Sequence, residues 1–236
     1  MAKFPGHDLT EVICGFWFVP SEDQWNPTNF ETYFEKAKPF GYSEKLQQKD
    51  IKVQFNLDPG SPETSSAKGE TTANRFVFRN PNEATAILLG PHYISAHKLK
   101  PYHNWESFFP ATIKPALELF LELGFGKVLA AANVAYINQI NVPSGQSISD
   151  LLGFIPTSNA LKKGNQFNVM FQSQYQFGAN LTAQLRLFQI GATEEFSTFT
   201  FECSCISVNH SGKSSFEELA NLAHDKANEI FNSILK

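Results

Sequence analysis

Three segments between residues 169 and 205 alternate apolar and polar residues, and this alternation limits the possible folds more than any other feature of the chain. A repeat of two residues is typical of β-strands that bury one face. The side chains predicted to point inward are Val169, Phe171, Tyr175 and Phe177, then Leu181, Ala183, Leu185 and Leu187, then Phe199, Phe201, Cys203 and Cys205. The segments therefore predict three antiparallel strands over one core.

An amphipathic helix is predicted after the third strand. Ser214 and Ser215 each have a glutamate three residues later, which is the pattern of a capping box at a helix start. Apolar residues then recur at helical spacing, namely Phe216, Leu219, Ala220, Ala223, Ala227, Ile230 and Ile234. We expect this helix to cover the inner face of the three strands.

The first half of the chain shows the same order of elements. A strand is predicted over Glu11–Val19, and a helix begins at Pro27, with Asn26 as its cap. Three strands and a second helix are then predicted over Ile51–Leu57, Arg75–Arg79, Thr85–Leu99 (bent near Gly90 and Pro91) and Trp105–Leu121. The stretch 58–74 is rich in Gly, Ser, Pro and Thr, and it is predicted to be a mobile loop.

The second half opens with a predicted strand over Lys127–Val142 and a brief helix over Ser147–Phe154. Both halves thus follow the order strand, helix, three antiparallel strands, helix. The fold class is therefore predicted as α+β, with similar halves over 1–125 and 126–236 packed as one globular unit. Helix-grip folds and the saddle of TATA-binding protein have sheets braced by helices in this way, but such an analogy gives no function.

Composition excludes several classes of protein. The net charge is −4, from 19 basic and 23 acidic residues, which disfavours general binding to nucleic acid phosphates. The 3 cysteines make no secreted disulfide framework, and no apolar run is long enough for a membrane helix. We therefore expect a soluble cytoplasmic protein without a membrane partner.

Motifs for catalysis are missing from the sequence. There is no Gly-rich phosphate loop and no Gly-x-Ser-x-Gly turn, and Gly212-Lys213-Ser214 is interpreted as a turn and helix cap. His92, His97 and His103 are spaced by five and six residues, which fits neither face of a strand nor one face of a helix. No catalytic residue, cofactor or metal site is predicted. The missing catalytic motifs favour a protein that is not an enzyme.

The outward residues of the three C-terminal strands form an unusual polar surface. This predicted interaction surface is rich in Gln and Thr and contains little charge: Gln172, Gln174, Gln176, Thr182, Gln184, Arg186, Thr198 and Thr200. A solvated sheet face has the same pattern, whereas a protein interface would use it for hydrogen bonds. Tyr102, Trp105 and Glu106, at a junction of strand and helix, either fill the core or extend this interaction surface.

Two short motifs carry a family resemblance. They are Lys100-Pro101-Tyr102 with Trp105-Glu106 and Phe108, and Tyr136-Ile137-Asn138 with Ile140 and Pro143. With Leu9-Thr10-Glu11-Val12 and Asn209-His210, these motifs make the chain resemble a sporadically distributed family of uncharacterised prokaryotic proteins. The family usually has Arg before the second motif's Tyr, where this chain has Ala135. The resemblance implies a horizontally transferred gene, near mobile or defence loci, and no known chemistry.

Three hypotheses for function remain open. The first is a non-enzymatic protein-binding or assembly module that forms a homodimer or has a dedicated protein partner. The alternative is a small-molecule pocket protein or enzyme with Tyr136, Asn138 and His210 as polar contacts in an aromatic cavity. A nucleic-acid reader is disfavoured because basic residues are not interleaved with the aromatic residues of the strands.

Overall fold

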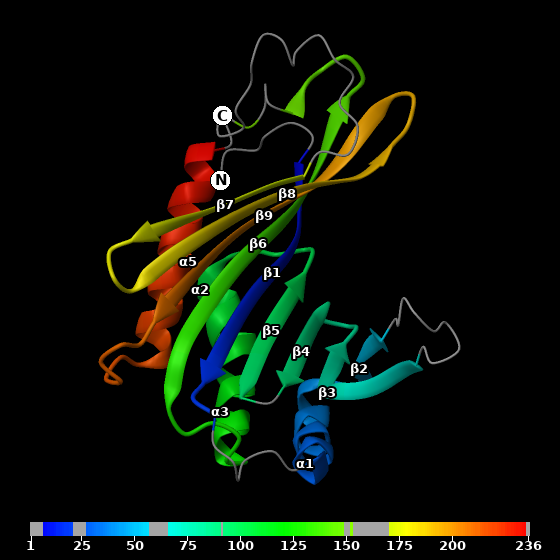
Figure 1. The fold of residues 1–236 in the computed structure, drawn as a ribbon. Coiled ribbons are helices and arrows are strands. Elements are labelled where there is room, and N and C mark those ends of the chain that lie inside the picture. The colour runs from blue at the N-terminus through cyan, green and yellow to red at the C-terminus, as the bar shows by residue number, and fades with distance from the viewer. Residues whose placement is uncertain are drawn as a thin grey trace.

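The computed structural model describes residues 7–20, 27–56, 66–90, 92–148, 152 and 170–234. It is an α+β fold built on one nine-stranded antiparallel sheet with the order β2-β3-β4-β5-β1-β6-β9-β8-β7 (Figure 1). The strands are β1 (His7–Phe18), β2 (Glu44–Asn56), β3 (Ser66–Asn80), β4 (Thr85–Gly90), β5 (Tyr93–Leu99), β6 (Leu129–Pro143), β7 (Met170–Phe177), β8 (Leu181–Ala192) and β9 (Phe196–Val208). The helices are α1 (Pro27–Ala37), α2 (Trp105–Phe108), α3 (Lys114–Glu122) and α5 (Phe216–Ile234).

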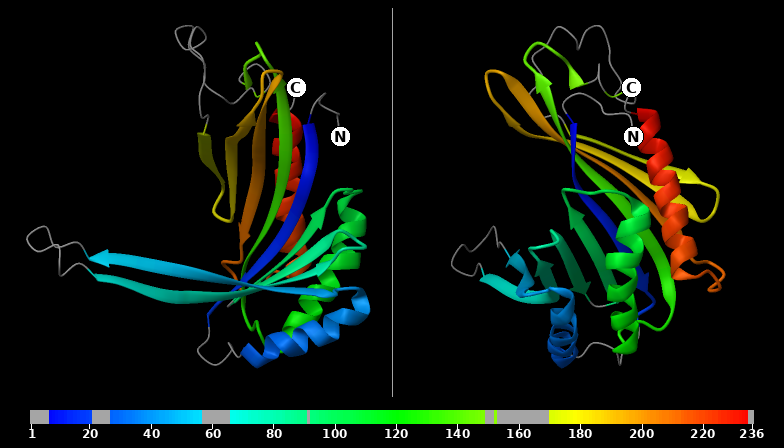
Figure 2. Two further views of the ribbon diagram at one scale, coloured as in Figure 1. Left: turned by 90° about the vertical axis from the view of Figure 1, so that its right-hand side faces the viewer. Right: turned by 180° about the vertical axis from the view of Figure 1, so that it is seen from behind.

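The helices all lie on one side of the sheet (Figure 2). Helices α1 and α3 lie beside β3, β4 and β5, and α5 packs on β6, β8 and β9. In the left-hand view of Figure 2, β6–β9 run up the page while the β2–β3 ribbon runs across it. Within the described residues, no helix lies on the opposite side, which we call the helix-free face.

Strand β1 joins the two parts of the sheet. It pairs with β5 on one side and with β6 on the other, so that Cys14 lies between Ala96 and Val134. Its inner side chains, Val12, Cys14, Phe16 and Phe18, are all buried beneath the helices. The first predicted strand is therefore confirmed, and it begins four residues before Glu11.

The predicted inner faces of two C-terminal strands are confirmed. Every inward residue predicted for β8 and for β9 is at most 5% exposed. Helix α5 covers them with a stripe of small residues, Ala220, Ala223 and Ala227, which lets the helix approach the sheet closely. The capping box is also present, because Ser215 Oγ accepts the Glu218 amide while Glu218 Oε2 accepts the Ser215 amide.

The inner face predicted for β7 is not buried in the same way. Phe171 is half-buried, whereas Tyr175 and Phe177 are 45% and 38% exposed. Alternation alone does not bury a strand, and β7 is the outermost strand, beyond the strands on which α5 packs. Val169 and most of the predicted helix over Ser147–Phe154 lie outside the described residues.

The predicted loop over 58–74 is wrong for its second part. Ser66 to Asn74 belong to β3 and pair with β2 from Lys49 to Asn56. Backbone pairing satisfies the amides of this ribbon, and Ser66–Asn74 contains no apolar residue larger than alanine, so the composition of that stretch resembles that of a loop. Residues 57–65 lie outside the description.

The predicted bend near Gly90 is a complete reversal of the chain. Gly90 pairs with Tyr93, and β4 and β5 form a hairpin in which Ile87 lies opposite Ala96. His92 has φ +61°, the left-handed conformation that tight hairpins require. The first half therefore has four antiparallel strands after its first helix, one more than predicted.

The helix predicted over Trp105–Leu121 is confirmed, with a π-helical turn over Phe109–Ile113 between α2 and α3. Pro110 lies in that turn, where it removes one amide from the helical ladder. The helix ends at Gly124, whose φ of +78° suits glycine. Phe120 then packs between the rings of Phe18 and Phe125 in the core.

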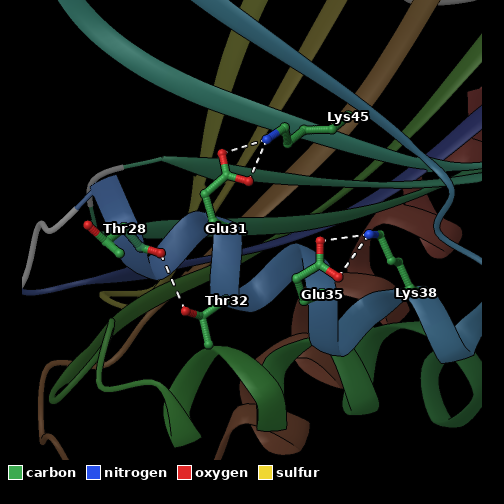
Figure 3. A network of polar contacts seen from close by, with 6 residues as sticks. All are labelled: Thr28, Glu31, Thr32, Glu35, Lys38 and Lys45. Carbon is green, nitrogen blue, oxygen red and sulfur yellow. Dashed lines mark hydrogen bonds and ion pairs between the residues drawn. The ribbon is translucent and has the colours of Figure 1, made fainter.

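Helix α1 is attached to β2 by a charged contact between Glu31 and Lys45 (Figure 3). Lys45 of β2 reaches Glu31 at 2.5 Å, and Lys38 reaches Glu35 at 2.6 Å. Both lysine ammonium groups also lie over the Phe34 ring, at 5.0 Å for Lys38 and 5.6 Å for Lys45. Exposed ion pairs contribute little alone, so burial of the apolar face of α1 fixes its position.

Candidate functional site

The polar residues predicted on the C-terminal strands lie together on the helix-free face. Register places Gln172 opposite Arg186, Gln174 opposite Gln184 and Gln176 opposite Thr182. Arg186 in turn lies opposite Glu202 of β9, on the same face as Thr198 and Thr200. Alternation along each strand directs these residues away from α5, because their neighbours are the buried inner residues.

Charge on this part of the helix-free face is paired. Arg186 Nη1 lies 3.5 Å from Glu202 Oε2, and both side chains are partly shielded from solvent. Thr198 Oγ1 donates to Asn141 Oδ1 of β6 at 3.0 Å, which continues the polar surface across a third pair of strands. The surface of β7, β8 and β9 therefore offers amide and hydroxyl groups without an excess of either charge.

The helix-free face continues across β6 into β1 and β5. The Asn133 and Tyr93 side chains close over Gly15 at its centre, where a Cβ would lie 2.6 Å from Asn133 Oδ1 and 2.7 Å from the Tyr93 hydroxyl oxygen. Tyr93 stacks against Trp17 with ring centroids 4.9 Å apart. The centre of the face thus combines aromatic rings with buried polar atoms.

A hydrogen-bonded relay crosses the centre of this face. Ser95 Oγ lies 2.8 Å from His97 Nε2, and His97 Nδ1 lies 2.6 Å from Glu11 Oε1. Ser95 and His97 are two residues apart on β5 and so share a face, while Glu11 comes from the neighbouring β1. The sequence interpretation treated His97 only as one of three poorly spaced histidines and missed this relay.

The order Ser–His–Glu is that of a catalytic triad, but the surroundings of Ser95 do not suit a nucleophile. Ser95 is 1% exposed, so a substrate has little access to its hydroxyl. Its strand is paired on both sides, with Leu88 on β4 and Gly15 on β1. Backbone amides in such a ladder are not free to stabilise an oxyanion. The hydrogen bonds of the relay instead hold the side chains of Ser95, His97 and Glu11 in place on the helix-free face.

Tyr102, Trp105 and Glu106 lie on the helix side of the sheet and not with the glutamines. Trp105 and Glu106 line a cleft of about 450 Å³ between α2 and α5, which we call the interhelix cleft; its other lining residues are Phe109, Pro110, Lys114, Glu217, Asn221, His224 and Asp225. The Trp105 ring stacks on His224 at 4.4 Å, and its Nε1 donates to Asn221 Oδ1 at 2.8 Å. The predicted interaction surface is therefore divided between two sides of the molecule.

The residues of the two resemblance motifs meet behind the interhelix cleft. The Tyr102 and Tyr136 rings lie 6.4 Å apart, and Tyr136 lies 6.3 Å from the His224 ring. Burial raises the pKa of Tyr102 to about 12 and raises that of Tyr136 further, so both hydroxyls stay neutral at physiological pH. Asn138 lies on β6 two residues after Tyr136 and is 1% exposed. Neither its side-chain oxygen nor its side-chain nitrogen has a hydrogen-bond partner among the described residues.

His210 does not join Tyr136 and Asn138. It lies in the turn after β9, where its Nε2 is 3.1 Å from the Ala179 carbonyl. The adjacent Asn209 bonds to Ala130, six residues before Tyr136 on β6, which corresponds to about 20 Å along a strand. Of the three predicted pocket contacts, Tyr136 and Asn138 are therefore neighbours on β6, and His210 lies apart from them.

Burial makes the three cysteines poor ligands and poor nucleophiles. Cys14, Cys203 and Cys205 are each fully buried, and burial raises the pKa of every one of these thiols. Within the described residues, no three His, Cys, Asp or Glu side chains gather as a metal site would need. In the same part of the chain, every helix is too short or too polar to cross a membrane.

Comparison with protein-family models, with curated proteins and with solved structures found no match.

Proposed function

We propose that this protein is a non-enzymatic protein-binding module whose helix-free face receives a dedicated protein partner. The observation that carries the proposal is the helix-free face itself, which extends over every strand of a nine-stranded sheet. Its C-terminal part is rich in Gln and Thr with paired charge, a composition that suits a hydrogen-bonded protein interface. Such a module fits the resemblance to a family encoded in mobile or defence-associated operons.

The same proposal includes an origin of the fold by duplication. In each part of the sheet the first strand pairs with the strand that precedes the closing helix, β1 with β5 and β6 with β9. The first strands, β1 and β6, pair with each other at the centre. Equivalent connections around one central pair support two similar halves, with one extra strand in the first.

We expect a charge on the helix-free face to weaken partner binding. Gln184→Lys and Thr200→Lys would each place an uncompensated ammonium group in the interface and raise the dissociation constant about tenfold or more. The matched control is Asn232→Lys, which adds the same charge at an exposed position of α5. The measurement is titration calorimetry with the product of an adjacent gene that copurifies with the wild-type protein.

The control separates a local effect from a change in net charge. Equal affinity in all three variants would contradict a role for the helix-free face, and loss of binding in Asn232→Lys alone would place the partner on the helices. Thermal unfolding of the three variants should agree with wild type, because surface substitutions change stability little.

A second candidate function is binding of a small molecule at the interhelix cleft. Asn138 is not one of the residues that line the cleft, but it supports a ligand that reaches the core behind it, because a buried amide without partners among the described residues is costly and such groups often serve a ligand. The resemblance motifs also meet behind the cleft, through Tyr102 and Tyr136. A ligand here would contact aromatic rings and a small number of polar groups, as in most pockets for small molecules.

Asn138→Leu tests this candidate through two readouts. Removal of an unsatisfied buried amide should raise the free energy of unfolding by about 1–3 kcal/mol. If the amide holds a ligand, native mass spectrometry should show a small molecule bound to the wild-type protein and absent from the variant. A wild-type mass equal to that of the chain alone would remove this candidate.

A further inference from the structure

A second pocket lies on the helix side of the sheet, between α1 and α3, which contact each other (Figure 1). It has a volume of about 360 Å³ and shares no lining residue with the interhelix cleft. The lining residues used below are Tyr33, Phe40, Tyr42, Glu83, Ala111 and Pro115. We call this site the N-terminal pocket, and the functions proposed above do not use it.

Aromatic rings line the N-terminal pocket and are held in place from behind. Tyr33 is 0% exposed, its ring stacks on Phe78 of β3, and its hydroxyl donates to the Ala116 carbonyl at 2.9 Å. Phe40 is 62% exposed, although Asn80 Nδ2 fixes its main chain by donating to the Phe40 carbonyl at 2.9 Å. An exposed ring on a fixed backbone gives a ligand apolar surface to cover.

The wall from α3 begins in the π-helical turn. Ala111 of this turn and Pro115, one turn later, both line the N-terminal pocket. The Ala111 carbonyl points along the helix toward Pro115, which has no N–H to donate to it. This carbonyl therefore lacks its usual α-helical donor and is available to accept a hydrogen bond from a ligand. Single π-helical turns within α-helices are frequent at functional sites.

The polar groups of the N-terminal pocket favour a ligand that donates hydrogen bonds. Glu83 is exposed and is the one charged residue in the described lining, which contains no Lys, Arg or His. The Lys98 ammonium group bonds to the main-chain carbonyl of Glu83 and is not part of the lining. Burial raises the pKa of Tyr33 and of Tyr42, so both hydroxyls stay neutral. An ammonium group would meet an opposite charge here, and an anion would not.

We infer that the N-terminal pocket binds a small aromatic amine. Its ring covers Phe40, and its ammonium group lies between the Glu83 carboxylate and the Ala111 carbonyl. The pocket volume is at the lower end of the range for small-molecule sites, about 300–1,000 Å³, which suits a single bicyclic ring with a short amine chain.

Binding at this site is weak and leaves the helix-free face open. Because the charged contact is exposed to solvent, we expect a dissociation constant on the order of 0.1 mM for a ligand of this size. Purified protein would therefore carry no ligand. The pocket and the helix-free face lie on opposite sides of the sheet, so a protein partner and an amine bind independently.

Three compounds with the same indole ring test the class of ligand. Tryptamine carries an ammonium group, tryptophol a hydroxyl group and indole-3-acetate a carboxylate. Saturation-transfer NMR titrations of the full chain should show the tightest binding for tryptamine, about threefold weaker binding for tryptophol, and at least tenfold weaker binding for indole-3-acetate. The inference fails if tryptamine does not bind, or if either other compound binds as tightly.

Substitutions at two exposed lining residues locate the site. Phe40→Ala should weaken tryptamine and tryptophol about tenfold, because it removes the ring that they cover. Glu83→Gln should remove the advantage of tryptamine and leave tryptophol unchanged. The matched control is Phe177→Ala, which truncates an exposed ring on β7 and should change neither affinity.

The same variants show which outcomes contradict the inference. Unchanged tryptamine binding in Phe40→Ala, an equal loss in Phe177→Ala, or a preference for tryptamine that persists in Glu83→Gln would each overturn it. Both lining variants should bind the protein partner as wild type does, because neither residue lies on the helix-free face. Failure of the amine site and failure of the partner site are therefore separate results.

Discussion

We expect the free energy of unfolding to fall steeply above pH 9, because the native protein keeps thiol protons that the unfolded chain releases. Burial raises the pKa of Cys14, Cys203 and Cys205 above the ordinary value of 9.0. The stability that the three protonated thiols give to the native state is fully present below pH 9 and is lost as the pH rises above that value. Each thiol contributes about 1.4 kcal/mol per pH unit, or about 4 kcal/mol per unit together. Above pH 10 the buried Tyr33 and Tyr136 add to the slope.

Urea titrations between pH 8 and pH 11 in the presence of a reductant measure this slope. A variant with all three cysteines replaced by alanine should lose the part of the slope between pH 9 and pH 10, although its absolute stability is lower. A slope in that interval that is equal in both proteins would show that the thiols ionise in the native state. Domains are typically stable by about 5–15 kcal/mol, so we expect the wild-type protein to unfold by about pH 11.

Phe120→Ala should be the most damaging single substitution among the aromatic residues that join helices to sheet. Phe120 is 0% exposed, and its ring lies 5.2 Å from Phe18 of β1 and 5.2 Å from Phe125. Phe125 in turn lies 5.0 Å from Phe30 of α1, so the Phe120 ring supports both N-terminal helices. Truncation should lower the free energy of unfolding by about 3–5 kcal/mol.

Phe40→Ala is the matched control, because Phe40 has the same side chain but is 62% exposed. Its truncation should change stability by less than about 0.5 kcal/mol. Equilibrium denaturation in urea gives both values. A loss below about 1 kcal/mol for Phe120→Ala would mean that neighbouring rings close the cavity and that the cluster is not tightly packed.

Local sequence signals predicted those parts of the fold that depend on near neighbours. The capping box of α5, the inner faces of β8 and β9, and the end of the helix at Gly124 all follow from residues within a few positions. The exposure of β7 could not be predicted, because it depends on how far α5 extends across the sheet. The strand from Ser66 to Asn74 was missed, because backbone pairing with β2 and no large apolar side chain defines it.

Strand alternation placed the glutamine and threonine residues on one face without any structural information. The relay of Glu11, His97 and Ser95 could not be predicted, because it depends on the register between β1 and β5. Trp105 and Asn221 are separated by 116 positions, so no local sequence pattern predicts the interhelix cleft. A histidine two residues after a serine on an alternating strand was the one available signal for the relay.

The most direct test of a protein-binding function is native mass spectrometry on untagged protein coexpressed with its adjacent genes. Our account predicts a stoichiometric complex with a second protein, which Thr200→Lys removes and Asn232→Lys retains. It also predicts a mass with no small molecule or metal on the chain. A stoichiometric ligand together with no partner chain would contradict the account and would direct attention to Asn138 and the interhelix cleft.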